Sequence, residues 1–187
     1  MKLRLIGLSL VAVFAFSVVA SASAHEFIAS KTGTLKGTGG AQVFKTSAGN
    51  VECASLTASG QVTALKAASQ NVSVAYEKCE AFGSKVTIST AEYAFNAAET
   101  VGVIGKAIVV TDATGKCSVL VSFGGANATL KTVKYKNVGK GITTETNVAA
   151  INYTPTGGVC GTAKLNTNGT YTGSATTEVV GGTLKWE

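Results

Sequence analysis

The sequence predicts a single all-β domain of mainly antiparallel strands, stabilised by disulfides. Threonine, valine, alanine and glycine dominate the composition, and these residue types suit pleated strands and the turns between them. Short runs in which apolar residues alternate with polar ones recur along the chain, separated by Gly, Asn or Ser. Four cysteines, at positions 53, 79, 117 and 160, provide the material for two cross-links.

The first 24 residues have the organisation of a signal peptide. Lys2 and Arg4 form a charged start, residues 5–20 are almost wholly apolar, and small residues lead up to Ala24. This pattern predicts export and cleavage after Ala24. A permanent membrane anchor is the weaker alternative, because the apolar run is short for a span of about 20 residues and ends in the small-residue site. We therefore expect a secreted or extracytoplasmic protein.

The remaining chain, residues 25–187, has a length typical of one domain and sufficient for a proper core. It holds 14 lysines, no arginine and ten acidic residues, so its formal charge is about +4. The absence of Arg and the small number of aromatic residues argue against nucleic-acid recognition, which relies on both. Nothing in this part of the chain resembles a transmembrane segment.

A predicted hairpin at residues 71–95 organises the rest of the chain. Val72, Val74 and Tyr76 repeat at every second position, and Val86 and Ile88 do the same after a turn that contains Gly83. A period of two is typical of strands with one buried face. Further strands are expected at 42–46, 51–54, 61–65, 72–77, 85–89, 92–95, 107–111, 117–123, 130–136, 142–148, 151–154, 170–175 and 183–186.

Many short strands at such spacing indicate a β-sandwich or a β-barrel. We favour the antiparallel β-sandwich over the barrel, because the connections differ in length and cysteine links suit two packed sheets. Residues 64–70 are the one helical candidate, although this short segment could equally be a loop. Asn168-Gly169 is the strongest hairpin turn signal in the sequence. The expected core consists of Val74, Tyr76, Val86, Ile88, Val119, Val121, Val133, Tyr135, Ile151 and Tyr171.

In an exported chain the four cysteines are best explained as two disulfides. Their spacing does not match a zinc site, and His25 is the single histidine. Of the three possible connectivities we favour Cys53–Cys79 with Cys117–Cys160, in which each bridge joins a strand to a later strand or its loop.

The order VEC, Y-x2-C-x2-FG, EYAF, GKCSVLV, LKTVKYKNVG, INYT, C and NGTYTG resembles a group of small exported β-rich actinobacterial proteins that have no assigned activity. The resemblance covers residues 27–175. Many of those proteins carry two further cysteines, before the position of Tyr93 and near Gly105, and both are missing here. Their joint absence implies that those two pair with each other, which supports the connectivity above. No functional residue can be carried over.

The residues needed for common catalytic sites are largely missing. A serine or cysteine hydrolase would need a general base, and His25 is the single histidine that could serve as one. A hydrolase that uses paired carboxylates could draw on Glu77, Glu80, Glu92 and Glu99. A calcium site would need clustered acidic oxygens, and the chain has a single Asp. We expect a protein that is not an enzyme and that has no metal or cofactor.

One run of charge stands out, with four lysines and no acidic residue at Lys131, Lys134, Lys136 and Lys140. Such a run is most often a solvated face that resists aggregation, but it suits weak attraction to an anionic cell-wall polymer or envelope surface. We favour a non-catalytic structural or adhesive protein that is secreted or belongs to the cell envelope. The alternatives are a small-ligand carrier with a cavity inside a barrel and, less favoured, a glutamate-based hydrolase.

Overall fold

The computed structural model describes residues 25–47, 49–81, 83–104, 108–122, 129–131, 133–157 and 163–187, with the backbone alone at 129–131. The predicted signal peptide lies outside these residues. The described part contains strands and turns and no helix that could cross a membrane. The strands are β1 (Phe27–Ala29), β2 (Gly33–Thr46), β3 (Gly49–Val62), β4 (Lys66–Ala67), β5 (Ser69–Ala81), β6 (Ser84–Ile88), β7 (Ala91–Asn96), β8 (Thr100–Ile104), β9 (Ile108–Asp112), β10 (Ser118–Ser122), β11 (Thr129–Lys131), β12 (Val133–Val138), β13 (Gly141–Thr156), β14 (Asn166–Val179) and β15 (Leu184–Trp186).

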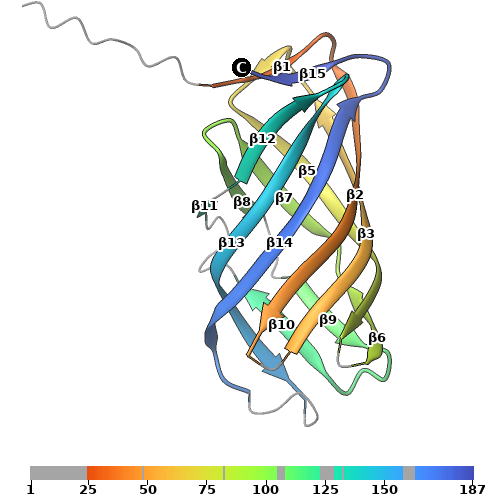
Figure 1. Cartoon of the computed structure of the whole chain (residues 1–187), viewed down its shortest axis with the longest axis vertical. Helices are drawn as coiled ribbons and strands as arrows, with labels where there is room; N and C mark the ends of the chain where they lie inside the picture. Colours follow the sequence, from red (N-terminus) through yellow and green to blue (C-terminus); the bar gives the residue numbers. More distant parts are fainter. Residues whose placement is uncertain are drawn as a thin grey trace, which may run out of the picture.

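Eight of these strands form a closed antiparallel barrel, drawn as a long cylinder in Figure 1. The ring runs β5-β3-β2-β14-β13-β10-β9-β6 and closes because β6 pairs with β5 as well as with β9. The prediction of an all-β, antiparallel, disulfide-stabilised fold is therefore confirmed. Of the two architectures considered, the structure has the barrel, so the preference for a sandwich was wrong. Alternation along each strand marks one buried face and cannot tell whether the sheet closes on itself.

Two long strands each pair with different neighbours along their length. On β5, residues 69–74 pair with β7, whereas residues 79–81 pair with β6. On β13, residues 141–146 pair with β12, whereas residues 152–156 pair with β10. Strands β7, β8, β11 and β12 thus continue the wall at one end of the cylinder, where β6, β9 and β10 do not reach.

A small sheet of order β15-β1-β4 covers that end, which we call the cap end (Figure 1). Phe27 and Leu184 from this sheet are buried against the barrel interior. The Trp186 ring donates from Nε1 to the carbonyl of Ala97 at 2.8 Å, and the Trp186 backbone exchanges two hydrogen bonds with the Asn137 side chain. The cap joins the two ends of the described chain, because β1 pairs directly with β15.

The interior holds two apolar clusters. The cap-end cluster includes Leu35, Val133 and Ile142, and the cluster at the other end includes Val51 and Tyr153. Among the ten residues predicted for the core, six are buried and four are partly buried but packed against these clusters. The buried six are Val74, Val119, Val121, Val133, Tyr135 and Ile151, and the partly buried four are Tyr76, Val86, Ile88 and Tyr171.

The central hairpin is present as predicted. Strands β5 and β6 pair with Ala81 opposite Ser84, and Gly83 in their turn has a φ of 74°, which glycine adopts without strain. Cys53 and Cys79 lie directly opposite each other on β3 and β5 and form a disulfide, with 3.9 Å between their Cα atoms. This half of the predicted connectivity is confirmed.

The second predicted bridge is described only in part. Cys117 is disulfide-bonded, and Cys160 lies outside the described residues. A disulfide of this kind indicates an oxidising, extracytoplasmic environment.

Two local predictions were wrong. The helical candidate at 64–70 forms β4 and the start of β5. Asn168-Gly169 lies inside β14 rather than in a turn, because its two residues contact Tyr153 and Phe44. The Tyr153 hydroxyl donates to Asn168 Oδ1 at 3.0 Å, and a Cβ on Gly169 would lie 3.0 Å from the Phe44 ring. Long-range packing therefore overrides the local turn preference.

A β-bulge in β13 contains a strained residue. The β13–β14 register shifts between Val148 and Ile151, and Ala150 in this bulge has a φ of 58°. Side chains with a Cβ adopt this left-handed conformation at a cost of about 1–2 kcal/mol, whereas glycine adopts it freely.

We therefore expect Ala150→Gly to stabilise the protein by about 0.5–1 kcal/mol, the strain relieved less the entropy that glycine adds to the unfolded chain. Its neighbour Ala149 is exposed on the same strand and does not have a positive φ, so Ala149→Gly is the matched control and should destabilise by a similar amount. Urea unfolding of both variants measures this. Equal destabilisation by both substitutions would contradict it.

Candidate functional site

The candidate site is a cavity of about 110 Å³ inside the barrel, bordered by both apolar clusters. Its lining is mainly apolar and comes from strands on all sides of the ring, with Leu56 of β3, Phe95 of β7 and Val148 of β13 as examples. Within the described residues, no Asp, Glu, Lys, Arg or His lines it. An eight-stranded barrel is just wide enough for its side chains to fill it or to leave room for one small ligand.

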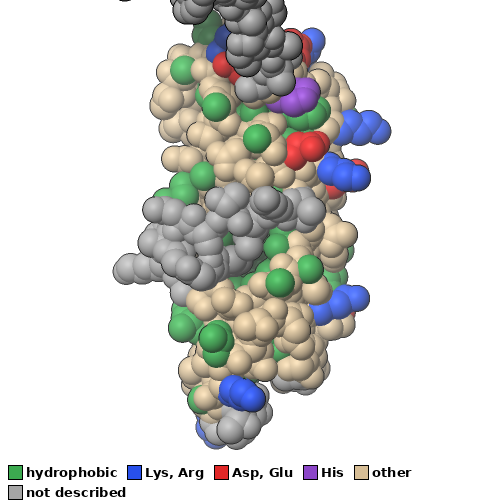
Figure 2. All heavy atoms as spheres, turned by 90° about the vertical axis from the view of Figure 1, so that its left-hand side faces the viewer, with side chains coloured by type: hydrophobic (Ala, Val, Ile, Leu, Met, Phe, Trp, Pro, Cys, Tyr) green, Lys and Arg blue, Asp and Glu red, His purple; other side chains and the backbone are tan. Residues whose placement is uncertain are grey.

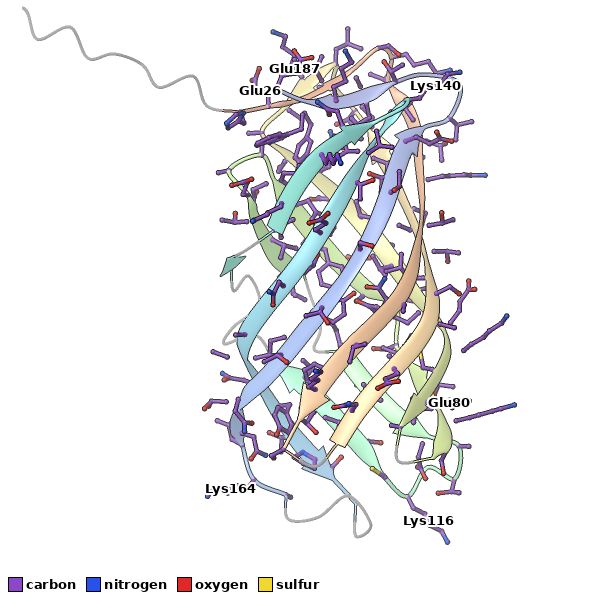
Figure 3. The ribbon with its side chains drawn as sticks, in the orientation of Figure 1. Glu26, Glu80, Lys116, Lys140, Lys164 and Glu187 are labelled. Carbon is purple, nitrogen blue, oxygen red and sulfur yellow. A yellow bond between two sulfur atoms is a disulfide. The ribbon has the colours of Figure 1, made fainter. Side chains whose placement is uncertain are left out.

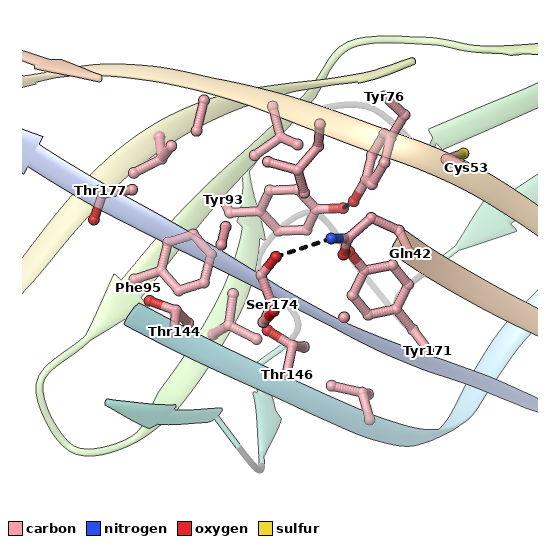
Figure 4. A pocket seen from close by; sticks show the side chains of 18 of the residues that line it. Gln42, Cys53, Tyr76, Tyr93, Phe95, Thr144, Thr146, Tyr171, Ser174 and Thr177 are labelled. Carbon is pink, nitrogen blue, oxygen red and sulfur yellow. Dashed lines mark hydrogen bonds between the residues drawn. The ribbon is translucent and has the colours of Figure 1, made fainter. Parts of the chain in front are cut away.

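A polar layer crosses the cavity where the two apolar clusters meet. It consists of Tyr76 on β5, Tyr93 on β7, Tyr171 on β14 and Gln42 on β2, and Figure 4 shows these four side chains turned toward one another. The Tyr76 and Tyr93 hydroxyl oxygens are hydrogen-bonded at 2.8 Å. The Tyr171 hydroxyl donates to Gln42 Oε1, and the Tyr171 ring meets the Tyr76 ring edge to face with 6.4 Å between centroids.

Irregularities in two neighbouring strands place Gln42 in this layer. The β14–β2 register shifts between Gly173 and Ala175, opposite residues 39–42 of β2. Gln42 is 2% exposed, and its Nε2 donates to the carbonyls of Gly40 at 2.9 Å and Ser174 at 3.0 Å (Figure 4). Its carboxamide occupies the space that a Cβ on Gly173 would need. Both amide protons are thus used by backbone carbonyls, and the amide oxygen is left to accept from Tyr171.

Burial keeps the tyrosines of this layer neutral. Desolvation raises the pKa of Tyr76 and of Tyr171 well above the ordinary value, and the neighbouring phenols raise them further. The pKa of Tyr93 is also raised, by desolvation and then by Tyr171. Nearer the cap, desolvation and then Glu99 raise the pKa of Tyr135. The described residues that line the cavity are therefore uncharged at physiological pH.

Two further polar side chains line the cavity without a partner. Gln70 on β5 is 7% exposed and Thr144 on β13 is 9% exposed. Within the described part of the chain, neither side chain makes a hydrogen bond. No buried side-chain nitrogen or oxygen of the described residues lacks a hydrogen-bond partner, so the polar atoms of Gln70 and Thr144 are open to the cavity. Water or a ligand there can pair with them.

The predicted lysine run lies on the outer surface, not at the cavity. Lys134 and Lys136 are exposed on β12, and Lys140 is exposed in the turn at the cap end (Figure 3). Lys131 lies in β11, and its side chain is outside the described residues. The run is less free of acid than the sequence indicated, because Glu145 of β13 lies directly opposite Lys134. On the face drawn in Figure 2 the lysines are spaced apart rather than gathered in one patch.

The structure does not bring the candidate glutamates to a common cleft. Glu77, Glu80, Glu92 and Glu99 are all exposed, and none of them lines the cavity. Among the described residues, no group of three or more metal-ligating side chains comes together. His25 is exposed and stacks on Trp186, with 4.1 Å between ring centroids.

No family model, no curated protein and no solved structure matches the chain. The resemblance to exported actinobacterial proteins therefore stays a prediction, and the geometry of the site is what bears on function.

Sequence reasoning found Tyr76 and Tyr171 as core residues but missed the layer they form. Gln42 was placed at the start of a predicted strand, where it has the parity of Phe44, but its polar side chain gave no reason to place it inside. Thr144 alternates with Ile142 and is followed by Val148 at the same parity, so its inward position could have been read from the period of two.

The buried phenols predict the behaviour of the protein at alkaline pH. At about pH 11, the phenolate absorbance of the folded protein should fall well short of that of five free tyrosines and should rise on unfolding in urea. The folded-state pKa values lie above the unfolded value of about 10, so the stability that these phenols contribute is complete below pH 10 and is lost as pH rises toward the folded values. Full phenolate absorbance at pH 11 with an intact circular dichroism spectrum would contradict this.

Proposed function

We propose that this protein is an exported, non-catalytic carrier that holds a small, mainly apolar molecule inside its barrel. The observation that carries the proposal is the cavity of about 110 Å³ in the middle of a closed barrel. An engineered apolar cavity of about 150 Å³ in another protein binds benzene or xenon, so a volume of this order accommodates a molecule of roughly five or six non-hydrogen atoms. Binding sites of this kind are concave and mostly apolar, with a few placed polar groups.

Three further features support a carrier over the other functions that the sequence left open. The cavity lies inside a closed ring of strands that the Cys53–Cys79 bridge cross-links and the cap covers at one end, so it is preformed. The exposed glutamates give no support to a hydrolase. A structural or adhesive protein needs no interior space, and leaving 110 Å³ unfilled costs on the order of 2.5 kcal/mol. Residues 1–24, predicted to be a signal peptide, support export and placement outside the cytoplasm.

Filling the cavity tests the proposal. Ala58 lines the cavity, and Ala75 on the neighbouring strand is exposed on the outer face, so Ala58→Leu and Ala75→Leu are a matched pair. The three added carbon atoms of Ala58→Leu should weaken binding of 2-methylbutane and butan-2-one at least tenfold, whereas Ala75→Leu should leave both unchanged. Titrations followed by NMR of residues lining the cavity measure the affinities, and circular dichroism confirms the fold. Failure of both probes to bind the unaltered protein would remove the proposal.

A second role at the surface rests on Lys136 and Lys140, which are exposed and, unlike Lys134, have no acid opposite them in the sheet. We infer weak attraction of this face to anionic wall polymer. Lysine is a hydrated point charge, so the attraction should show little chemical specificity. The screening length is about 8 Å at 0.15 M salt, so contact should fade as salt rises.

Replacing Lys131, Lys134, Lys136 and Lys140 together by Gln should abolish retention of the protein on purified cell wall. Lys136→Gln with Lys140→Gln should account for more of the loss than Lys134→Gln, because Glu145 already offsets Lys134. Sedimentation with cell-wall fragments at rising salt measures retention. Retention that persists in all variants, or that is indifferent to about 0.5 M salt, would leave this face as a solvated surface.

A further inference from the structure

We propose that the ligand of the barrel is uncharged and carries one oxygen that accepts hydrogen bonds, set in a hydrocarbon frame, as in a small ketone, ester or alcohol. This inference rests on the proposed carrier function and names the class of molecule carried. Its basis is the pair of unpartnered side chains, Gln70 and Thr144, that line a cavity otherwise bordered by apolar groups and tyrosines.

The first step concerns charge. The lining offers no counter-ion among the described residues, and desolvation inside the barrel keeps the three phenols of the polar layer protonated. Moving an unpaired carboxylate or ammonium into such a site costs far more than the burial of a few carbon atoms returns. The cavity therefore selects against fatty acids and amines of the same size.

The second step concerns the direction of the hydrogen bonds. Gln42 has both amide protons on backbone carbonyls and its oxygen on Tyr171, so it offers a ligand nothing. Gln70 has two amide protons and Thr144 has one hydroxyl proton, none of them donated to another described residue. These three protons are open to the cavity, because no buried side-chain nitrogen or oxygen of the described residues lacks a partner. A carbonyl or hydroxyl oxygen of a ligand can accept from them.

The third step concerns stability. The Thr144 hydroxyl donates to no other described residue and is open to the cavity, so exchanging it for a methyl group of the same shape breaks no hydrogen bond among them. Thr144→Val should therefore not lower the midpoint of thermal unfolding in the absence of ligand. A residue with a purely structural role would show a lower midpoint. Undiminished stability combined with weaker binding of an oxygen-bearing ligand is the behaviour expected of a binding residue.

The test uses four probes of five non-hydrogen atoms each and nearly the same shape: 2-methylbutane, butan-2-one, butan-2-ol and propanoate. In the unaltered exported protein, butan-2-one and butan-2-ol should bind, and propanoate should bind at least a hundredfold more weakly than butan-2-one. Thr144→Val should lower the ratio of butan-2-one affinity to 2-methylbutane affinity about fivefold to tenfold. Gln70→Met, which conserves volume, should act in the same direction. Thr57→Val, on the exposed outer face of β3, is the control and should leave the ratio unchanged.

The outcomes separate this inference from the carrier function. If 2-methylbutane binds but the affinity ratio is the same in Thr144→Val, in Gln70→Met and in the unaltered protein, the ligand class is wrong and the carrier stands. Butan-2-ol binding without butan-2-one would show that the site needs a donor, which also overturns the inference. Binding of propanoate equal to that of butan-2-one would refute the exclusion of charge. If no neutral probe binds, ordered water alone pairs with Gln70 and Thr144, and both proposals fail.

Discussion

The middle of this barrel depends on one side chain, the carboxamide of Gln42. The register between β2 and β14 shifts by one residue there, which takes the carbonyls of Gly40 and Ser174 out of the regular ladder. Gln42 turns inward and donates to both. A buried carbonyl without a donor costs about as much as a lost hydrogen bond, so the irregularity is tolerated because this amide repairs it. The absence of a side chain at Gly173 gives the amide its place.

The hydrogen bonds made by Gln42 affect the arrangement of side chains along the whole barrel interior. Because its amide protons are committed, Gln42 can only accept from Tyr171, and this fixes the Tyr171 ring across the interior. The Tyr76 and Tyr93 rings then meet beside it, and the two apolar clusters are kept apart instead of merging into one packed core. Cys53 is the direct partner of Gln42 across β2 and β3, and the Cys53–Cys79 bridge ties β3 to β5 at this level. In the chain-entropy model, a loop of this length contributes about 3.5 kcal/mol, enough to offset an imperfectly filled interior.

The sequence predicted what depends on short-range pattern and missed what depends on distant partners. The β5–β6 hairpin and its disulfide were accessible because their parts lie within about 30 residues of one another and carry a strict period of two. Strand β2 was predicted only from Gln42 onward, because its glycines at 33–40 resemble a loop until β3 and β14 are in place on either side. Closure of the sheet, the pairing of Lys134 with Glu145 and the tyrosine layer all join residues whose proximity no local pattern encodes. The cavity is missed for the same reason, since it is a property of the closed ring.

The polar residues inside the barrel are hard to explain by folding alone. A barrel of eight strands is filled most stably by interlocking apolar side chains, and exchanging Thr144 for Val or enlarging Ala58 would move this interior toward that state. The present chain instead keeps a neutral cavity lined by Gln70 and Thr144, whose donors bind no other described residue. Its disulfides and its cap offset the stability that this cavity costs. Tyr153, by contrast, is 1% exposed in the far cluster, and its hydroxyl is paired with Ser47 and Asn168. The same fold therefore pairs a buried hydroxyl within the protein in the far cluster, whereas the Thr144 hydroxyl beside the cavity is open to water or to a ligand.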